Sequence, residues 1–247
     1  IISALPMSRF HFYLADIQTV SSLVLDGIGL LPPSVLQMPL DKKMILFAKM
    51  QRMEQINTLH RCVIVKIDKA LKAEGIQAVF MKGQTVALRY PNPLHRTPGD
   101  IDFVVAPKDF DRTMAVMEKI GKVDHGLVHE HHGMAWVDDV VVEPHYKVHN
   151  YQRPSTDQAM QEMFSSVFPT ELSSADIDGY EVPVFPPTFE SVFLISHMVN
   201  HVYEEGLGLR QVIDYAMFLH NCANKIDWIQ HHEWLYRMRM ERAWRIF

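Results

Sequence analysis

The stretch from residue 75 to residue 150 constrains the fold most, because strand-like and helix-like segments alternate along it. Short runs of β-branched and aromatic residues, bounded by Gly, Pro and Asp, predict strands. The expected strands cover residues 76–81, 101–105, 134–137 and 140–146. The expected helices between them cover residues 84–90 and 109–120. Strands that alternate with helices in this way are typical of an α/β core.

Helical patterns lie on both sides of this core. Residues 42–72 carry apolar side chains at roughly every third or fourth position, which predicts a long helix. Beyond residue 150 the expected elements are a small hairpin at 176–182 and helices at 190–203, 210–223 and 227–246. The expected organisation is an N-terminal helical segment (1–72), the core (73–150) and a mainly helical C-terminal subdomain (151–247).

Composition excludes several classes of protein. The formal net charge of −5 disfavours nucleic acid as a partner, because proteins that neutralise many phosphates are usually strongly basic. Cys62 and Cys222 are too few for a disulfide framework or a four-thiolate zinc site, and they fit a reducing, cytoplasmic location. No apolar run reaches the roughly 18 residues of a membrane span, so no membrane partner is expected. The first residues lack an initiator Met and a charged segment, which indicates a trimmed end rather than a signal peptide.

Two aspartates lie at the start of the second expected strand. Because side chains alternate along a strand, Asp100 and Asp102 point to the same face. Carboxylates at this spacing are roughly 5–7 Å apart and repel each other by about 3 kcal/mol at an effective dielectric constant of about 20. The pair therefore indicates a nearby cation, although Asp-x-Asp at a strand end also occurs in ordinary turns and helix caps.

A third carboxylate, Glu143, lies within the apolar run expected at 140–146, and His145 shares its face of the strand. A carboxylate in such a run is costly to bury without a partner. If this strand neighbours the earlier one, Glu143 joins Asp100 and Asp102 in an all-oxygen cluster, the donor set that Mg²⁺ and Mn²⁺ prefer. These three residues are the candidate catalytic residues and metal ligands, and His145 is a candidate supporting residue.

Lys82 and Gly83 end the first expected strand and begin a helix. Backbone N–H groups at a helix start attract anions, and Gly83 allows close approach of a ligand to the backbone. The motif Gly-x-x-x-x-Gly-Lys-Ser/Thr is absent, which excludes a P-loop NTPase. Lys82 and Arg96 are candidate phosphate partners, and the alternative for each is a solvated surface charge.

These segments resemble, in order, the uncharacterised nucleotidyltransferase family of bacteria, which belongs to the DNA-polymerase-β-like nucleotidyltransferase superfamily. The resemblance rests on Lys82-Gly83, Tyr90-Pro91-x-Pro93, Arg96, Gly99–Val105, Val142–Tyr146, His197-x-x-x-His201, Gly208–Asp214 and Ile226-Asp227-Trp228. It covers most of residues 75–230. It implies a minimal nucleotidyltransferase core with a mixed sheet, followed by a helical domain.

The resemblance also implies roles for individual residues. Asp100 and Asp102 would hold two divalent metal ions, and Glu143 would bind one of them and help to orient the acceptor hydroxyl. The nucleotide would be bound by Lys82, Gly83, Gln84, Arg96 and Gly99. The implied reaction is in-line attack of a hydroxyl at the α-phosphorus of an NTP, with release of pyrophosphate.

Three features depart from the wider superfamily. The usual Gly-Ser or Gly-Gly turn is Gly83-Gln84 here, so one hydroxyl contact to phosphate is missing. The third carboxylate is Glu143 rather than the commoner Asp. Pro144 removes one N–H from its strand, which predicts an edge position or a bulge.

The histidines need separate treatment. His197 and His201 are four residues apart and share one helix face, but residue 198 is Met, so the His-Glu-x-x-His motif of metalloproteases is absent. We expect both to hydrogen-bond Arg210 or Asp214 on the next helix. The alternatives are a structural zinc ion held together with Asp214 and direct contact with the nucleotide or acceptor. A further group, His129, His131 and His132, is expected in an exposed turn, the alternative being a flap over the site.

The expected function is a nucleotidyltransferase that uses Mg²⁺ or Mn²⁺, takes an NTP as substrate, and has a small molecule, a protein or an RNA end as acceptor. Two other functions stay open. One is a catalytically silent module that binds a nucleotide or a partner, which Gln84 and Pro144 favour. The other is a toxin-like nucleotidyltransferase, paired with an antitoxin, that modifies tRNA or a protein. The acceptor, the preferred base and the oligomeric state are left open by the sequence.

Overall fold

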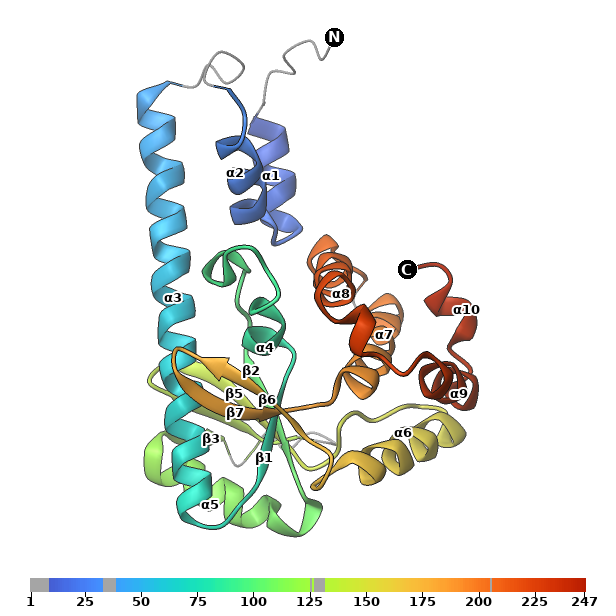
Figure 1. Ribbon diagram of the computed structural model, residues 1–247. Coiled ribbons are helices and arrows are strands. Elements are labelled where there is room, and N and C mark those ends of the chain that lie inside the picture. Colours follow the sequence, from blue (N-terminus) through green and yellow to red (C-terminus); the bar gives the residue numbers. More distant parts are fainter. Residues whose placement is uncertain (1–8, 33–38, 125, 127–131, 205) are drawn as a thin grey trace.

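The computed structural model describes residues 9–32, 39–124, 126, 132–204 and 206–247. In this part of the chain, helices lie on both faces of one seven-stranded mixed sheet (Figure 1). The expected α/β architecture with flanking helical regions is therefore confirmed. None of the described helices is both long and apolar enough to cross a bilayer.

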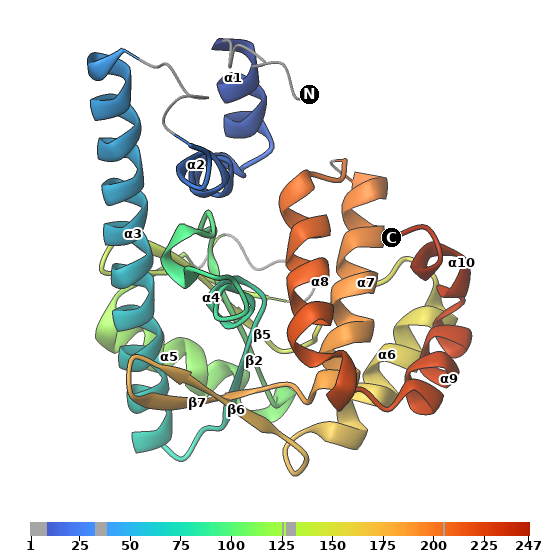
Figure 2. The same ribbon diagram turned by 45° about the horizontal axis from the view of Figure 1, so that its top comes forward.

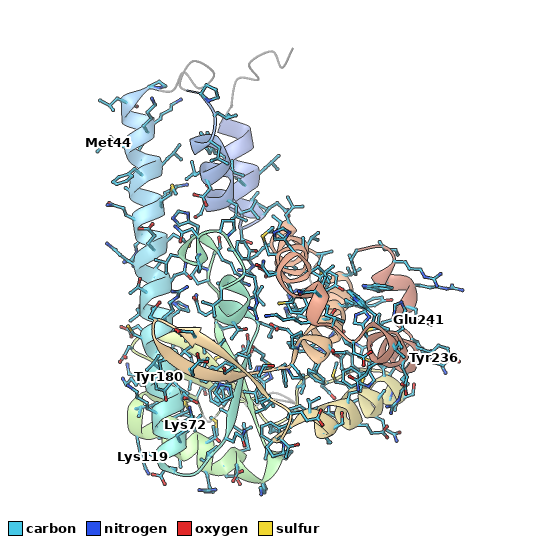
Figure 3. All side chains as sticks on the ribbon, viewed as in Figure 1. Met44, Lys72, Lys119, Tyr180, Tyr236 and Glu241 are labelled. Carbon is cyan, nitrogen blue, oxygen red and sulfur yellow. The ribbon has the colours of Figure 1, made fainter. Side chains whose placement is uncertain are left out.

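Three helices precede the sheet: α1 (Arg9–Ile17), α2 (Ser21–Gly29) and α3 (Leu40–Ala73). The long helix expected at 42–72 is confirmed as α3, which has 34 residues. The buried residues of α3 lie in its C-terminal half, which packs on the sheet. Met44, near the other end, is 60% exposed (Figure 3). The N-terminal half of α3 thus extends beyond the sheet, with α1 and α2 on the same side (Figure 1).

The strands of the sheet have the order β3-β4-β5-β2-β1-β7-β6. They are β1 (Ala78–Met81), β2 (Ile101–Val105), β3 (Lys122–Asp124), β4 (Met134–Val137), β5 (Val140–His145), β6 (Ser173–Ile177) and β7 (Tyr180–Val184). β2 is antiparallel to β1 and parallel to β5, and β7 is parallel to β1. The expected hairpin, now β6 and β7, follows residue 150 in the chain but extends the same sheet as the core strands.

Two strand predictions need correction. β3 is absent from the prediction because its three residues, partly exposed, are too few to show a period. The edge or bulge position predicted for Pro144 is wrong, because β5 lies inside the sheet between β4 and β2 in a regular register. Pro144 lies opposite Gly133, just before β4 begins, and its carbonyl accepts the Gly133 N–H at 2.9 Å. The N–H that Pro lacks therefore falls outside the regular β4–β5 ladder, so Pro is tolerated there.

Alternating side chains of the central strands build two apolar layers. On one face Phe80 and Phe103 pack against α3 and α5 (Phe110–Ile120). On the other face Val79 and Val104 pack against the C-terminal helices. Figure 2 shows α3 and the C-terminal helices on opposite sides of the sheet.

The second apolar layer is completed by α6 (Pro154–Val167), α7 (Pro187–Glu204), α8 (Leu209–Cys222) and α9 (Trp228–Met238). The single helix predicted at 227–246 is wrong, because Arg239 adopts a left-handed backbone conformation (φ 59°, ψ 34°) that ends α9 before the short α10 (Glu241–Trp244). The helix expected at 84–90 is the shorter α4 (Gly83–Ala87). Three 3₁₀ turns complete the described elements: η1 (Pro93–His95), η2 (Pro107–Asp109) and η3 (Ala223–Lys225).

Tyr180 connects the β6–β7 hairpin to α3. Its hydroxyl donates to Asp68 Oδ2 at 2.8 Å, and the ammonium groups of Lys69 and Lys72 lie 5.0 and 5.2 Å from its ring centroid. Figure 3 shows Tyr180 and Lys72 side by side. These contacts hold the β6–β7 hairpin against α3.

Candidate active site

The register of β2 and β5 brings three carboxylates together. The strands are parallel, with Asp102 paired to Glu143, and Asp100 lies just before β2 begins. One carboxylate oxygen from each of these three residues lies within 4.8 Å of the others. The two strands are neighbours, so the expected carboxylate cluster forms. Its donor atoms are all oxygen, which fits Mg²⁺ or Mn²⁺.

The cluster carries an excess of negative charge. The charge of Asp102, and then burial, raises the pKa of Asp100. Burial raises the pKa of Glu143 to about 7, and the charges of Asp102 and Asp100 add to this effect. Both carboxyl groups thus ionise less readily than they would in water. A divalent cation bound between them would favour their ionised forms and so lower both pKa values.

Asp102 is compensated by two neighbours. Lys82 Nζ lies 2.9 Å from Asp102 Oδ1, and His145 Nε2 donates to the same oxygen at 3.0 Å. Burial alone would raise the pKa of Asp102, but the Lys82 ammonium and the His145 hydrogen bond outweigh burial and hold it below its usual range. His145 therefore contacts the carboxylate cluster directly, as its place on the Glu143 face predicted.

The Lys82-Gly83 turn has an unusual backbone. Lys82 has φ 57° and ψ −153°, a conformation that residues with a Cβ rarely adopt, and Gly83 has φ 44°. This conformation connects β1 to α4 and places the Lys82 side chain, 19% exposed, against Asp102. Backbone strain of this kind is concentrated at functional sites, so the turn is a further reason to locate a site here.

Gln84 and Gly99, both expected to bind the nucleotide, make contacts within the fold. The Gln84 amide is buried, donates to Asn57 Oδ1 at 2.5 Å and accepts from Arg61 Nε at 3.4 Å. The Gly99 carbonyl accepts from His60 Nε2 at 2.8 Å. These contacts attach two turns to α3, and both turns lie next to the carboxylate cluster.

A pocket opens beside the cluster between the turn and the C-terminal helices. It is lined by Lys82, Val86, Arg96, Leu194, His197, Met198, Arg210, Gln211 and Asp214. Three of these residues carry positive charge and one carries negative charge. Lys82 lines this pocket and also contacts Asp102, so the pocket lies next to the carboxylate cluster.

Arg96, expected to contact phosphate, forms a buried ion pair instead. Its Nε and Nη2 donate to the two carboxylate oxygens of Asp214, both at 2.8 Å, and Tyr90 also donates to Asp214 Oδ1. Arg210 on α8 keeps more of its donors available. It donates to the Thr97 carbonyl at 3.4 Å, and its Nε is buried without a hydrogen-bond partner among the described residues.

His197 and His201 bind each other rather than the next helix. Their Nε2 atoms are 3.1 Å apart, and Asp214 and Arg210 make the other contacts described above. Neither ring hydrogen-bonds Arg210 or Asp214 among the described residues, so that prediction is wrong; the Asp214 carboxylate is instead bound by Arg96 and Tyr90. Burial holds the pKa of His197 well below its usual value, so this ring is neutral in the pocket wall.

His132 lies beside the carboxylate cluster, a position that the sequence did not reveal. The exposed position predicted for it is wrong: it is 8% exposed, forms a β-bridge with His145, and its Nε2 lies 3.7 Å from Glu143 Oε1. The signal was present in the turn at Asp138-Asp139, because continuing the hairpin register from that turn places residue 132 opposite residue 145. His129 and His131 lie outside the described residues.

Comparison with known proteins identifies the family. Residues 12–246 match the family of uncharacterised nucleotidyltransferases. No curated protein sequence gives a significant match. The solution structure of the antibiotic-resistance factor ANT(2'')-Ia is similar, with a TM-score of 0.53 at 15% identity over 76% of this chain and 95% of that one. The crystal structure of ANT(2'')-Ia with adenylyl-2''-tobramycin has a TM-score of 0.51 at 14% identity, over 72% and 98% of the two chains.

The two structural likenesses concern the fold, and the family match includes the strands that carry the carboxylate cluster. The family expected from the ordered sequence segments is thereby confirmed. The match leaves out the first 11 residues and the last one of the 247-residue chain. The chain belongs to the family of uncharacterised nucleotidyltransferases.

Proposed function

We propose that this protein transfers an NMP from an NTP to a hydroxyl group of an acceptor and depends on Mg²⁺ or Mn²⁺. The observation that carries the proposal is the meeting of Asp100, Asp102 and Glu143 on adjacent strands of a nucleotidyltransferase fold. ANT(2'')-Ia has been crystallised with adenylyl-2''-tobramycin, a small molecule that carries a nucleotidyl group. A small hydroxylated molecule is therefore one class of acceptor, beside a protein and an RNA end.

The three carboxylates would hold the metal ions. The charge of Asp102 and then burial raise the pKa of Asp100, and burial and then the two aspartates raise the pKa of Glu143. This accumulation of buried negative charge supports the presence of a cation in the working enzyme. A bound divalent ion stabilises the negative charge that develops on the attacking and leaving oxygens. His145 keeps Asp102 in place through its hydrogen bond to Oδ1.

Lys82 and Arg210 would bind the phosphates. Both line the pocket beside the cluster, and Asp214, the one carboxylate in the pocket wall, is already paired with Arg96. The pocket therefore has a positive charge that suits a triphosphate. The backbone N–H groups at the start of α4 contribute less than expected, because α4 has five residues and its dipole is correspondingly small.

The chemistry is a single displacement. The acceptor oxygen forms a bond to the α-phosphorus while the bond from this phosphorus to the bridging oxygen of the β-phosphate breaks. Pyrophosphate leaves with the electron pair of that bond, and the proton of the hydroxyl passes to solvent. The protein positions the reacting groups and supplies the charges that surround them.

Binding of an NTP in the presence of Mg²⁺ tests the proposal. Wild-type protein should be stabilised against heat by an NTP with Mg²⁺, by about 2.7 kcal/mol at a ligand concentration one hundred times Kd. Asp100→Asn should abolish this stabilisation, because the carboxylate cluster loses a ligand. Asp111→Asn, on the exposed surface of α5, is the matched control and should behave like wild type. If no NTP stabilises the wild-type protein in the presence of Mg²⁺, the proposal is wrong.

Two other functions are separated from this one by further measurements. Gln84 favours a catalytically silent module, since its amide is occupied within the fold, and such a module would bind an NTP without releasing pyrophosphate with any acceptor. A toxin-like nucleotidyltransferase would arrest growth when expressed, and Asp100→Ala would remove the arrest.

A further inference from the structure

Glu143 has two sets of potential metal-binding neighbours. Beside Asp100 and Asp102, it faces His132 and His145. His132 and His145 are opposite each other in the bridge that extends the β4–β5 ladder, and Glu143 lies two residues before His145 on the same strand. Side chains at these positions point to one face of the sheet, so the backbone register itself brings the three together.

The donor atoms are already near the spacing of a metal site. His132 Nε2 lies 3.7 Å from Glu143 Oε1, and His145 Nε2 lies 3.7 Å from Glu143 Oε2. The centroids of the two imidazole rings are 5.0 Å apart, and one ligand atom from each of the three residues lies within 4.8 Å of the others. Ligands of a tetrahedral ion with bonds of about 2.0 Å are about 3.3 Å apart, so small movements would complete the coordination.

The two sets differ in the metal that they favour. Carboxylate oxygens alone suit Mg²⁺ and Mn²⁺, whereas two imidazoles with one carboxylate suit Zn²⁺, Co²⁺ and related first-row ions. His132 and His145 are buried, with 8% and 2% of their surfaces exposed, which would shield the ion from most of the solvent. Three protein ligands leave a fourth position for water.

We propose that His132, Glu143 and His145 form a second metal site, which binds a transition-metal ion such as Zn²⁺ or Co²⁺ and excludes Mg²⁺ from the neighbouring carboxylates. Exclusion follows because both ions would need Glu143, and the hydrogen bond of His145 couples the two sets. Glu143 belongs to both sets, and His145 Nε2 donates to Asp102 Oδ1, a hydrogen bond that it must give up to ligate a metal. The binding site stands on its own geometry, and the antagonism with Mg²⁺ rests on the proposed function.

Co²⁺ provides a probe that does not depend on activity. Four-coordinate Co²⁺ with imidazole ligands absorbs strongly in the visible range, whereas six-coordinate Co²⁺ with oxygen ligands absorbs weakly. Titration of the wild-type protein with Co²⁺ should produce the strong bands. His132→Gln should lose them and keep the stabilisation by NTP and Mg²⁺, which also shows that the variant folds. Asp100→Asn should keep the bands and lose that stabilisation.

Two further arms complete the test. His232→Gln, which removes an exposed imidazole of α9, is the matched control and should titrate like wild type. Excess Mg²⁺ with an NTP should displace Co²⁺ from the wild type and leave it bound to Asp100→Asn. Absence of strong bands in the wild type, or their persistence in His132→Gln, overturns the second site. If the wild type shows strong bands but is not stabilised by any NTP, the second metal site is supported and the proposed function is wrong.

Discussion

At the scale of single residues, Glu190 is a buried carboxyl group in the C-terminal helices. It lies on α7 with 5% of its surface exposed, and burial raises its pKa to about 7 against the opposing charge of Arg89. In an unfolded chain a Glu titrates near pH 4.3. Because the folded pKa is the higher one, the contribution of Glu190 to stability is complete below the unfolded pKa and is lost as the pH rises toward 7.

Glu190→Gln should remove this loss. We expect the variant to be more stable than wild type by up to about 3 kcal/mol at pH 8 and to show no gain at pH 4, because the wild-type carboxyl is then protonated in both states. Urea denaturation at the two pH values measures the difference. Glu171→Gln, at an exposed position, is the control and should show no gain at either pH. A gain for Glu190→Gln that is equal at both pH values would contradict the assignment.

Site residues were predictable to different degrees for physical reasons. Asp100 and Asp102 share a face by local strand geometry, and Glu143 follows once the two strands are neighbours. His132 required the register of a hairpin to be continued across four residues. The partner of Arg96 could not be predicted, because a long, flexible side chain pairs with whichever carboxylate the packing of a distant helix brings within reach.

At the scale of elements, two polar contacts fasten the segment between α4 and β2. The ion pair of Arg96 and Asp214 joins this segment to α8, and both side chains are at most 10% exposed. His95 in η1 joins it to the N-terminal helices, because its ring contacts Asp26 of α2 and Glu54 of α3. The segment leads directly into Asp100, so these contacts also position the carboxylate cluster.

Asp214→Asn should destabilise the protein by about 3–5 kcal/mol, because the buried guanidinium of Arg96 is left without a counter-charge. The control is Glu74→Gln, which breaks the exposed pair with Lys119 and should change stability far less, because water screens exposed ion pairs. Urea denaturation compares the two variants. Equal losses would show that the ion pair of Arg96 contributes no more than a surface pair.

His95 should make the docking of α2 depend on pH. Burial opposes protonation of its ring, but the hydrogen bonds and charges of Asp26 and Glu54 outweigh burial and raise the pKa of His95 above its usual value. The stabilisation is therefore complete below about pH 6.5 and is lost as the pH rises through the folded pKa. His95→Gln should be less stable than wild type at pH 6 and should approach it at pH 9 in thermal denaturation. A difference that grows with pH would contradict this.

At the scale of the whole molecule, the two faces of the sheet pack in two different apolar layers. In β1, Phe80 packs in the layer with α3, while Val79 and Met81 pack in the layer with the C-terminal helices. β7, which comes after residue 150, covers the free edge of β1. The segments expected as core and C-terminal subdomain thus share one sheet and both of its apolar layers.

A fragment of residues 1–150 should therefore fail to fold cooperatively. It would expose the apolar face of β1 and β2 together with the edge of β1 that β7 covers. We expect no sigmoidal transition in urea by circular dichroism, with the full chain as the control. A cooperative transition of the fragment would show that residues 73–150 form an independent domain.

The sequence by itself determined the identity of most helices and strands, the alternation that makes an α/β core, and the shared face of Asp100 and Asp102. These follow from backbone periodicity, which acts over a few residues. The tertiary structure decided which charges meet: Lys82 with Asp102, Arg96 with Asp214, and His132 with Glu143. Such pairs depend on the order of strands and the packing of helices, because electrostatic contacts join side chains that are distant in sequence and have no period to reveal them.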